Sequence, residues 1–280
     1  MTAVTHAEGP ASQRSDPSSL LTRTERFGWW LGDVFARHLR LVAWAWSYVP
    51  MGVLLWLGLS RRVRLHGGEV LRAVPGDASL VFVVNHRSFF DLFCLVWVLR
   101  RAGVRQRLLF PVRSEFFYDH PLGPLLNLLV SGMSMFPPIF RHGRKRALNE
   151  RSLERCIAEL RRPGTALGFH PEGTRGRGPD PFSLLPSRPG VGRVVLGAPG
   201  VRVVPVFLLG LGNSVLAEVW RNWRSASEHP VDVSFGKDVG FDDLREGRPG
   251  AASARAAERC LAAIAEAAVP VRAAVGGGPR

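Results

Sequence analysis

The 280-residue sequence has little cysteine and lacks several common catalytic motifs, and these scarcities exclude some kinds of protein. Its three cysteines, Cys94, Cys156 and Cys260, lie far apart and form no C-x-x-C pair. Neither a disulfide framework nor a cysteine zinc site is predicted, so we expect three small core residues in a reducing compartment. No G-x-x-x-x-G-K-[ST], G-x-S-x-G or H-E-x-x-H motif occurs, and no dinucleotide fingerprint is complete.

Lysine is almost absent, and arginine carries nearly all of the positive charge. Lys145 and Lys237 are the only lysines among 37 basic residues, against 23 acidic ones, which gives a net charge of +14. This bias fits a genome rich in arginine codons. It also fits a protein that meets anionic partners such as phosphate headgroups, an acidic carrier protein or nucleic acid. With 46% apolar and 21% charged residues, the chain can bury an ample globular core.

A long uncharged segment near the N-terminus indicates contact with a membrane. Residues 41–59 carry no charge, and as one helix of roughly 1.5 Å per residue they would nearly match a bilayer core of about 30 Å. Pro50 should break this helix, and arginines flank it on both sides. Five of the eight tryptophans fall in residues 29–56. We therefore expect two helices lying in one leaflet with arginines on anionic headgroups; a spanning helix and a buried helix pair are the alternatives.

Beyond residue 75 the sequence alternates between short apolar runs and helical patterns. The predicted strands are 79–84, 108–112, 135–140, 165–169, 202–208 and 231–235. The clearest predicted helices are 89–101, 121–132, 145–161 and 251–268. This alternation predicts an α/β fold with a mixed, largely parallel sheet flanked by helices. We divide the chain into a disordered tail (1–20), membrane-associating helices (21–64), an α/β domain (65–270) and a flexible tail (271–280).

Polar residues directly follow the predicted strand at 79–84. Asn85, His86, Ser88 and Asp91 stand where this strand gives way to a helix, which is where α/β folds place ligands. With His86 in the turn and Asp91 in the first helical turn, the carboxylate can bond one ring nitrogen and leave the other as a base. The alternative is that His86 only caps the helix while Asp91 pairs with Arg87.

Two more polar loops follow predicted strands. In the loop after residue 169, Pro171 and Gly173 enforce a tight turn that leaves Arg175 free to meet an anion. An ordinary turn with a surface Glu–Arg pair would look the same. Arg141 opens a basic stretch that is either a phosphate cradle, a solvated basic face or a nucleic-acid patch. Few aromatic residues are interleaved there, so stacking on single strands is not supported.

Taken together, these loops resemble the motifs of the glycerolipid acyltransferases, the family of glycerol-phosphate and 1-acylglycerol-phosphate acyltransferases. The residues 85–91, NHRSFFD, are similar to the family's N-H-x-S-x-x-D motif, and residues 171–175, PEGTR, match its P-E-G-T-R motif. Arg141 and Val204-Pro205-Val206 resemble its two looser motifs. The order and spacing of the motifs agree with the family over roughly residues 65–240.

The resemblance implies a role for each residue that it matches. His86 is expected to be the general base on the acceptor hydroxyl, with Asp91 as its orienting partner. The expected substrate-binding residues are Asn85, Ser88, Arg141, Glu172, Gly173, Thr174 and Arg175. The thioester of acyl-CoA or acyl-carrier protein is the expected acyl donor, without an acyl-enzyme. No metal and no cofactor are implied.

The resemblance also predicts partners and a location. We expect a lysophospholipid acceptor, most simply 1-acylglycerol-3-phosphate, together with anionic membrane lipids and no nucleic acid. The expected place is the cytoplasmic face of a bacterial inner membrane. The sequence departs from the family motif at two positions: His170 stands where the family usually has another aromatic residue, and Gly176 stands where serine is common. These departures leave the identity of the acceptor undetermined. The alternatives are a different lysolipid, such as an amino-acid lipid or glycolipid, and a non-catalytic membrane-binding module.

Overall fold

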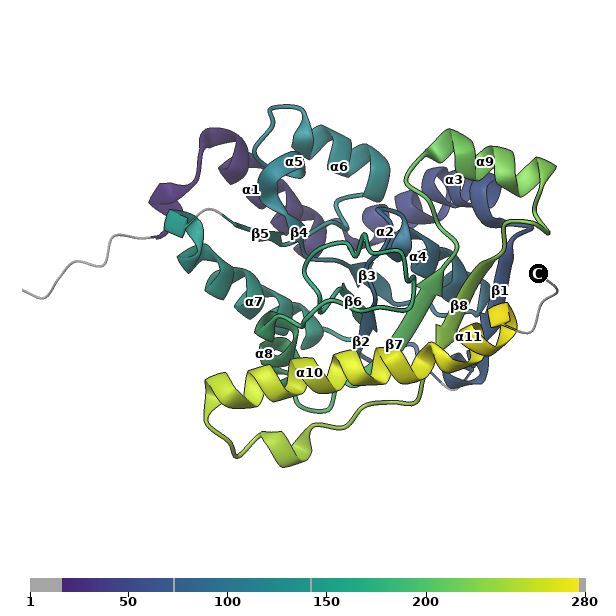
Figure 1. Cartoon of the computed structure of the whole chain (residues 1–280). Coiled ribbons are helices and arrows are strands. Elements are labelled where there is room, and N and C mark those ends of the chain that lie inside the picture. The colour runs from purple at the N-terminus through teal and green to yellow at the C-terminus, as the bar shows by residue number, and fades with distance from the viewer. Residues whose placement is uncertain (1–16, 73, 142, 277–280) are drawn as a thin grey trace, which may run out of the picture.

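A mixed six-stranded sheet forms the centre of the protein, in a computed structural model that describes residues 17–72, 74–141 and 143–276 (Figure 1). In spatial order its strands are β1 (Val63–His66), β8 (Val231–Phe235), β7 (Arg202–Leu209), β2 (Leu80–Val84), β6 (Thr165–Phe169) and β3 (Arg107–Leu109). Every neighbouring pair is parallel except β7 and β8. A separate parallel pair joins β4 (Val112–Arg113) to β5 (Pro138–Ile139). The predicted α/β class is confirmed.

Helices cover both faces of the sheet and give the protein three layers (Figure 1). Alternate side chains of β2 enter two separate cores: Leu80, Phe82 and Val84 pack into one, Val81 and Val83 into the other. The helices of the first face are α1 (Arg23–Arg37), α2 (Arg40–Tyr48), α3 (Pro50–Leu59), α4 (Asp91–Arg101), α5 (Ser114–Phe117), α6 (Gly123–Ser131) and α9 (Val215–Arg224). Those of the second are α7 (Ala147–Leu160), α8 (Pro189–Gly197), α10 (Pro249–Ala267) and α11 (Val269–Gly276).

The uncharged N-terminal segment forms two helices, with the break where Pro50 predicts it. Helix α2 ends at Tyr48, and α3 begins at Pro50, whose missing N–H costs nothing at the first position of a helix. By length and composition, Arg40–Leu59 could cross a membrane, and 25% of it is buried within the protein. Met51, Leu55 and Leu59 pack into the same core as β2. These helices are therefore part of the folded body.

The structure differs from the predicted domain boundaries at both ends. The boundary predicted between residues 64 and 65 falls inside strand β1, which pairs with β8 at the sheet edge. The tail predicted from residue 271 is helical to Gly276, because Val271 is fully buried against the second core. Of the predicted N-terminal tail, Pro17–Leu20 forms a 3₁₀ turn, and residues 1–16 lie outside the described residues, as do 277–280.

Candidate active site

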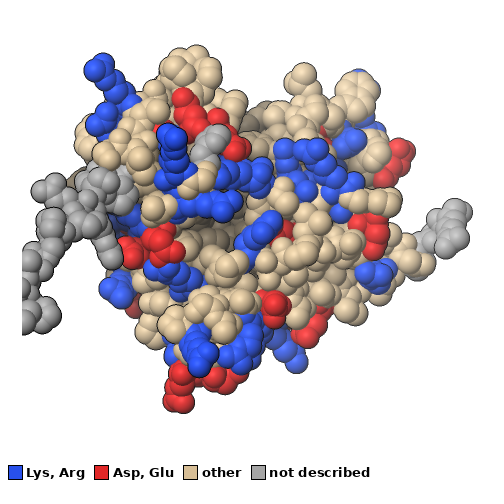
Figure 2. All heavy atoms as spheres, turned by 60° about the vertical axis from the view of Figure 1, so that its left-hand side comes forward, with Lys and Arg blue, Asp and Glu red and all other residues tan. Residues whose placement is uncertain are grey.

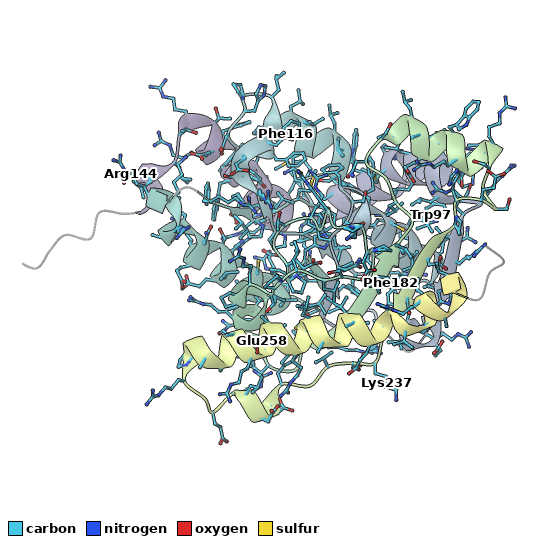
Figure 3. The ribbon with its side chains drawn as sticks, in the orientation of Figure 1. Trp97, Phe116, Arg144, Phe182, Lys237 and Glu258 are labelled. Atoms are coloured by element: carbon cyan, nitrogen blue, oxygen red, sulfur yellow. The ribbon has the colours of Figure 1, made fainter. Side chains whose placement is uncertain are left out.

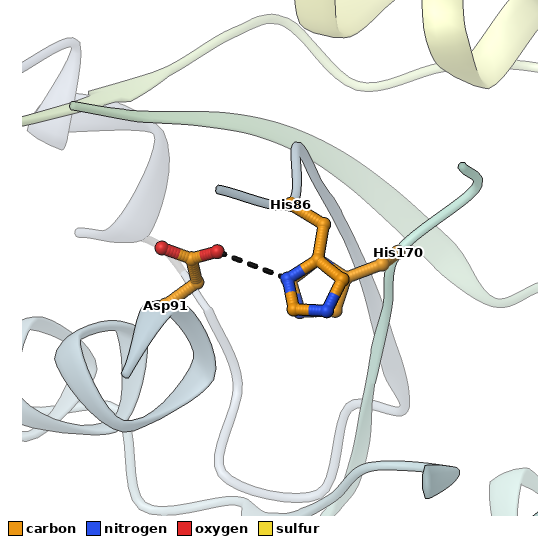
Figure 4. A group of neighbouring side chains, drawn as sticks. All are labelled: His86, Asp91 and His170. Atoms are coloured by element: carbon orange, nitrogen blue, oxygen red, sulfur yellow. Dashed lines mark hydrogen bonds and ion pairs between the residues drawn. The ribbon is translucent and has the colours of Figure 1, made fainter. Parts of the chain in front are cut away.

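The predicted His86–Asp91 pair forms where β2 passes into α4. His86 lies in the turn after β2, and Asp91 is the first residue of α4. Asp91 Oδ2 lies 3.1 Å from His86 Nδ1 and also accepts hydrogen bonds from the backbone N–H groups of Arg87 and Ser88, each at 2.8 Å (Figure 4). The Arg87 guanidinium instead donates to backbone carbonyls at Gly178 and Asp180. The carboxylate therefore orients the imidazole through Nδ1 and leaves Nε2 for chemistry.

Two residues that were predicted to bind substrate instead hold this turn in place. The side-chain amide of Asn85 is completely buried and exchanges two hydrogen bonds with the backbone of Leu208, at 2.9 and 2.7 Å. Ser88 is also buried, and its hydroxyl donates to the carbonyl of Gly212 and accepts from the N–H of Phe90. Asn85 binds strand β7 and Ser88 binds the loop after it, so the two side chains tie the turn that carries His86 to this part of the sheet.

Glu172 is a second clamp on the same turn. One of its carboxylate oxygens accepts from the backbone N–H of His86 and the other from that of Leu185, both at 2.8 Å. The side chain is 2% exposed, and burial raises its pKa. The N–H of Gly176 also donates to the carbonyl of His86 at 2.8 Å. The two sequence motifs are thus joined through backbone atoms, and Glu172 has both oxygens engaged within the protein.

The ring of His170 lies flat against the ring of His86. The two rings stack with centroids 3.8 Å apart and an angle of 9° between the planes (Figure 4). His170 Nδ1 donates to the carbonyl of Val84 at 2.9 Å, which fixes the tautomer. Burial and the neighbouring His86 lower the pKa of His170 to about 3, so this ring is neutral. His170, at which the sequence departs from the family motif, therefore keeps an aromatic ring stacked on His86.

The surroundings keep His86 in its basic form. Burial, Arg175 and Arg113 lower its pKa to about 4, because each disfavours the imidazolium. Burial raises the pKa of Asp91 to about 6, opposed by the electrostatic interaction with the nearby His170 and by the backbone hydrogen bonds from Ser88 and Arg87. At neutral pH the pair is a neutral imidazole oriented by a carboxylate, which is the state a general base needs.

The His86 ring opens on a cavity of about 670 Å³ with two chemically different parts. The basic part is lined by Arg113, Arg175 and Arg188. Figure 2 turns this side of the molecule forward and shows a hollow bordered by Lys and Arg side chains. The apolar part is lined by the side chains of Phe89, Leu92, Phe93, Phe110, Phe116, Phe117 and Met135. Such a volume suits a small amphipathic ligand with an anionic head and a hydrocarbon tail.

Arginines gather at the basic part of the cavity around the turn at Gly173. Gly173 has a φ of +63°, which favours glycine, and its carbonyl accepts from Arg113 at 2.9 Å and from Arg141 at 3.2 Å. Arg175 donates one bond to Asn213 at 2.9 Å. Thr174 lies half-buried in the same turn. Arg141 is exposed and is not among the residues that line the cavity, but it shares the Gly173 carbonyl with Arg113, which lines it.

Arg113 and Arg188 are cavity residues that the sequence analysis missed. Arg113 follows the apolar run at 108–112 directly, which is the signal that identified the other loops, but it belongs to no recognised motif. Arg188 precedes the first residue of α8, a helix that was not predicted. Burial and the nearby Arg141 lower the pKa of Arg113, so the cavity places like charges close together. An anionic ligand would relieve that repulsion.

His86, Asp91 and His170 are also the one group of three potential metal ligands within the described residues. Their ligand atoms lie within 4.8 Å of one another. However, both Nδ1 atoms are already hydrogen-bonded, and the rings are stacked almost in parallel, so their remaining lone pairs do not converge. Metal ligation requires lone pairs that point at a common centre. The arrangement is that of one imidazole, His86, hydrogen-bonded to Asp91 and stacked on His170.

Comparison with known proteins agrees with the motifs. A family model described as Acyltransferase matches residues 62–209, which include the His86 turn and the Glu172 loop. A chloroplastic 1-acyl-sn-glycerol-3-phosphate acyltransferase of Arabidopsis thaliana is 28% identical over 167 residues, which cover 57% of this chain and 40% of the plant protein. The match thus spans less than half of that relative. The chain belongs to the acyltransferase family, among the glycerolipid acyltransferases that its motifs resemble.

Proposed function

We propose that the protein transfers a fatty acyl chain to the free hydroxyl of 1-acylglycerol-3-phosphate and so makes phosphatidate. The observation that carries the proposal is the lining of one cavity, which combines arginines, the oriented His86 and a cluster of phenylalanine rings that contact one another. A lysophosphatidate combines the complementary groups, a phosphate, a free hydroxyl and a hydrocarbon chain. The printed name of the Arabidopsis thaliana relative supports this acceptor.

The geometry supplies a single-displacement mechanism. His86 Nε2 takes the proton of the acceptor hydroxyl as its oxygen attacks the carbonyl carbon of a thioester, from acyl-CoA or acyl-carrier protein. Asp91, bonded to Nδ1, stabilises the imidazolium that forms. The C–S bond then breaks, and the leaving sulfur receives the proton from Nε2. No acyl-enzyme forms, and the step uses neither a metal nor a cofactor, since the base and its orienting group are protein side chains.

The proposal places the enzyme on a membrane, where its lipid substrates are. The support is the apolar segment Arg40–Leu59 and the net charge of +14, which favours the anionic lipids of a bacterial inner membrane at its cytoplasmic face. Another lysolipid acceptor, an amino-acid lipid or a glycolipid, is the second candidate, and the observation in its favour is His170 in the cavity wall. The intact His86–Asp91 pair speaks against a non-catalytic module.

An acceptor screen tests the proposal. Purified protein is given isotope-labelled acyl-CoA or acyl-carrier protein with lysophosphatidate, other lysophospholipids, a lyso-amino-acid lipid and a lysoglycolipid, and products are identified by mass spectrometry. We expect labelled phosphatidate as the main product. Preferred acylation of an acceptor without phosphate would move the second candidate to first place, and no acyl transfer to any acceptor would refute the enzyme assignment.

The pKa values predict an unusually acid-tolerant enzyme. A proton on His86 removes the base, and a proton on Asp91 removes its partner; with pKa values of about 4 and about 6, both groups are in their active forms at pH 7. We therefore expect kcat/KM to stay level down to about pH 6 and to fall below it. In Arg113→Gln, loss of a positive charge near His86 should raise the pKa of His86 but leave this acid limb in place, because the higher pKa of Asp91 sets it. A limb above pH 7 in the unaltered enzyme would contradict the assignment.

A further inference from the structure

Helix α9 presents its polar side to the protein and its apolar side to the outside. Its buried residues are Glu218 and Asn222, at 5% and 0% exposure. Leu216 is 82% exposed and Trp220 is 62% exposed, and with Trp223 at 36% they form a stripe at helical spacing. A helix on a water-facing surface shows the reverse pattern. The inversion indicates that the outer face of α9 meets an apolar phase.

The inverted orientation of α9 is held by specific polar bonds to the end of α3. Asn222 donates to the carbonyl of Leu57 at 2.9 Å and accepts from the N–H of Arg61 at 2.9 Å. Glu218 forms a buried ion pair with Arg62 at 2.6 Å. Rotating α9 to hide its tryptophans would break this buried ion pair and remove the side-chain donors of Asn222 and Trp223 from the carbonyl of Leu57, at a high desolvation cost. The exposed apolar stripe is therefore a fixed feature.

The apolar surface continues from α9 onto α3. Trp223 contacts Trp56 of α3 edge to face, with ring centroids 5.2 Å apart, and Trp56 is itself 45% exposed. Val53 and Leu54 of α3 are 56% and 40% exposed. The last turns of the uncharged segment and a helix more than 150 residues later, 215–224, thus form one surface. Below, "the α3–α9 surface" means Val53, Leu54, Trp56, Val215, Leu216, Trp220 and Trp223.

Arginines border this surface. The guanidinium of Arg61 lies 4.1 Å from the ring centre of Trp223, and that of Arg224 lies 5.1 Å from the ring centre of Trp220. Tryptophan with an adjoining arginine suits the depth of the headgroups, where the ring lies in the acyl boundary and the cation meets phosphate. A second copy of the chain fits less well, because a twofold contact through this surface would bring arginines against arginines.

The α3–α9 surface lies on the same side of the molecule as other exposed apolar helices. Helices α1, α6, α3 and α9 follow the upper side of Figure 1, and Leu122 just before α6 and Leu125 and Leu129 within it are each more than half exposed. Phe116, which lines the cavity, is labelled near that upper side in Figure 3, whereas Lys237 and Glu258 lie on the lower side. A bilayer along the upper side would touch the apolar part of the cavity.

We propose that α9 inserts into the headgroup and acyl boundary of an anionic membrane, as a second docking element beside the N-terminal apolar segment. The inference deepens the proposed function, which supplies the reason for meeting lipid, but it concerns binding and not turnover. It assigns membrane contact to Leu216 and Trp220, in a part of the chain that sequence analysis placed in the α/β domain.

A fluorescent label at position 216 tests the insertion directly. All three native cysteines are buried, so Leu216→Cys can be labelled selectively in the full-length protein with an environment-sensitive thiol probe. With vesicles of phosphatidylcholine and phosphatidylglycerol we expect a blue shift, and quenching by lipids brominated on their acyl chains. The matched control is Val269→Cys on α11, at 63% exposure and on the lower side of Figure 1, which should show neither change. Equal, unquenched emission at both positions would overturn the proposal.

A binding measurement provides the second test. In vesicle sedimentation, Leu216→Ser with Trp220→Ser should weaken partitioning on the order of tenfold or more relative to Val269→Ser, because two apolar side chains leave the interface. Turnover of a substrate in detergent micelles should stay unchanged, which separates this result from a failure of the proposed function. If label quenching is absent and the double variant instead dissociates a dimer in analytical ultracentrifugation, the surface belongs to a second copy, and the membrane proposal is wrong.

Discussion

His86→Ala should abolish nearly all acyl transfer while the protein stays folded. A general base contributes about 10²–10⁴-fold to the rate. The other histidine that lines the cavity among the described residues, His170, stacks on His86 with its Nδ1 engaged and is not oriented to replace it. The bonds that hold the turn, from Glu172 to the N–H of His86 and from Gly176 to its carbonyl, are made to the backbone and survive the substitution. The measurement is kcat/KM with circular dichroism of the same preparation.

The chain contains its own control for this experiment. A second histidine–aspartate pair, His66 Nε2 to Asp232 Oδ1 at 2.9 Å, lies at the β1–β8 edge outside the cavity. His66→Ala should leave turnover unchanged. Asp91→Asn should be severe but milder than His86→Ala, because its amide oxygen can still accept from the Ser88 N–H while the charge that stabilises the imidazolium is lost. Wild-type turnover in His86→Ala would refute general-base catalysis by His86.

The sequence predicts the sheet centre better than its edges. Strands β2, β6 and β7 are largely apolar because both of their faces are buried, and β8 alternates apolar residues with the buried Asp232 and Ser234. Each of the four was predicted within one residue of its observed ends. Strand β1 was missed, since its four residues include Arg64 and His66. Helix α8 was also missed. A Cβ at Gly192 of α8 would collide with the carbonyl oxygen of Ser253 in α10. The formation of α8 therefore depends on its tight packing against α10 rather than on its own helix propensity.

Local sequence predicts the residues of the site but not the hydrogen bonds between its loops. Residue types and their order identify the His86 turn and the arginine loop. They do not show which polar side chains bind backbone: Asn85 pairs with Leu208, and Glu172 with His86 and Leu185, across distances in sequence that only the folded sheet closes. The same limit applies to α9. Its residues indicate an amphipathic helix, but which face is buried follows from the Arg62–Glu218 pair.

Arg175→Ala should lower kcat/KM for lysophosphatidate on the order of 10–10²-fold, the loss expected for one or two charge-assisted hydrogen bonds. Arg175 lines the cavity, and within the described part of the chain one of its nitrogens is bound, at 2.9 Å to Asn213, so the rest of its fork is available to a phosphate. Arg175→Lys keeps the charge and loses the fork. We expect it to act mainly through a raised apparent KM, with a loss of about tenfold, because the phosphate contact is equal in ground and transition states.

A comparison of phosphorylated and unphosphorylated acceptors shows whether this loss of kcat/KM reports phosphate recognition. Arg175 also lowers the pKa of His86, so its removal changes the base as well as the binding site. Kinetics at pH 8 avoid this, because His86 is neutral there in every variant. Arg177→Lys, exposed in the same loop, is the matched control and should match the unaltered enzyme. If the Arg175 variants lose phosphorylated and unphosphorylated lysolipids equally, Arg175 supports the loop rather than the phosphate, and Arg113 and Arg188 become the candidates for that contact, since they line the same cavity.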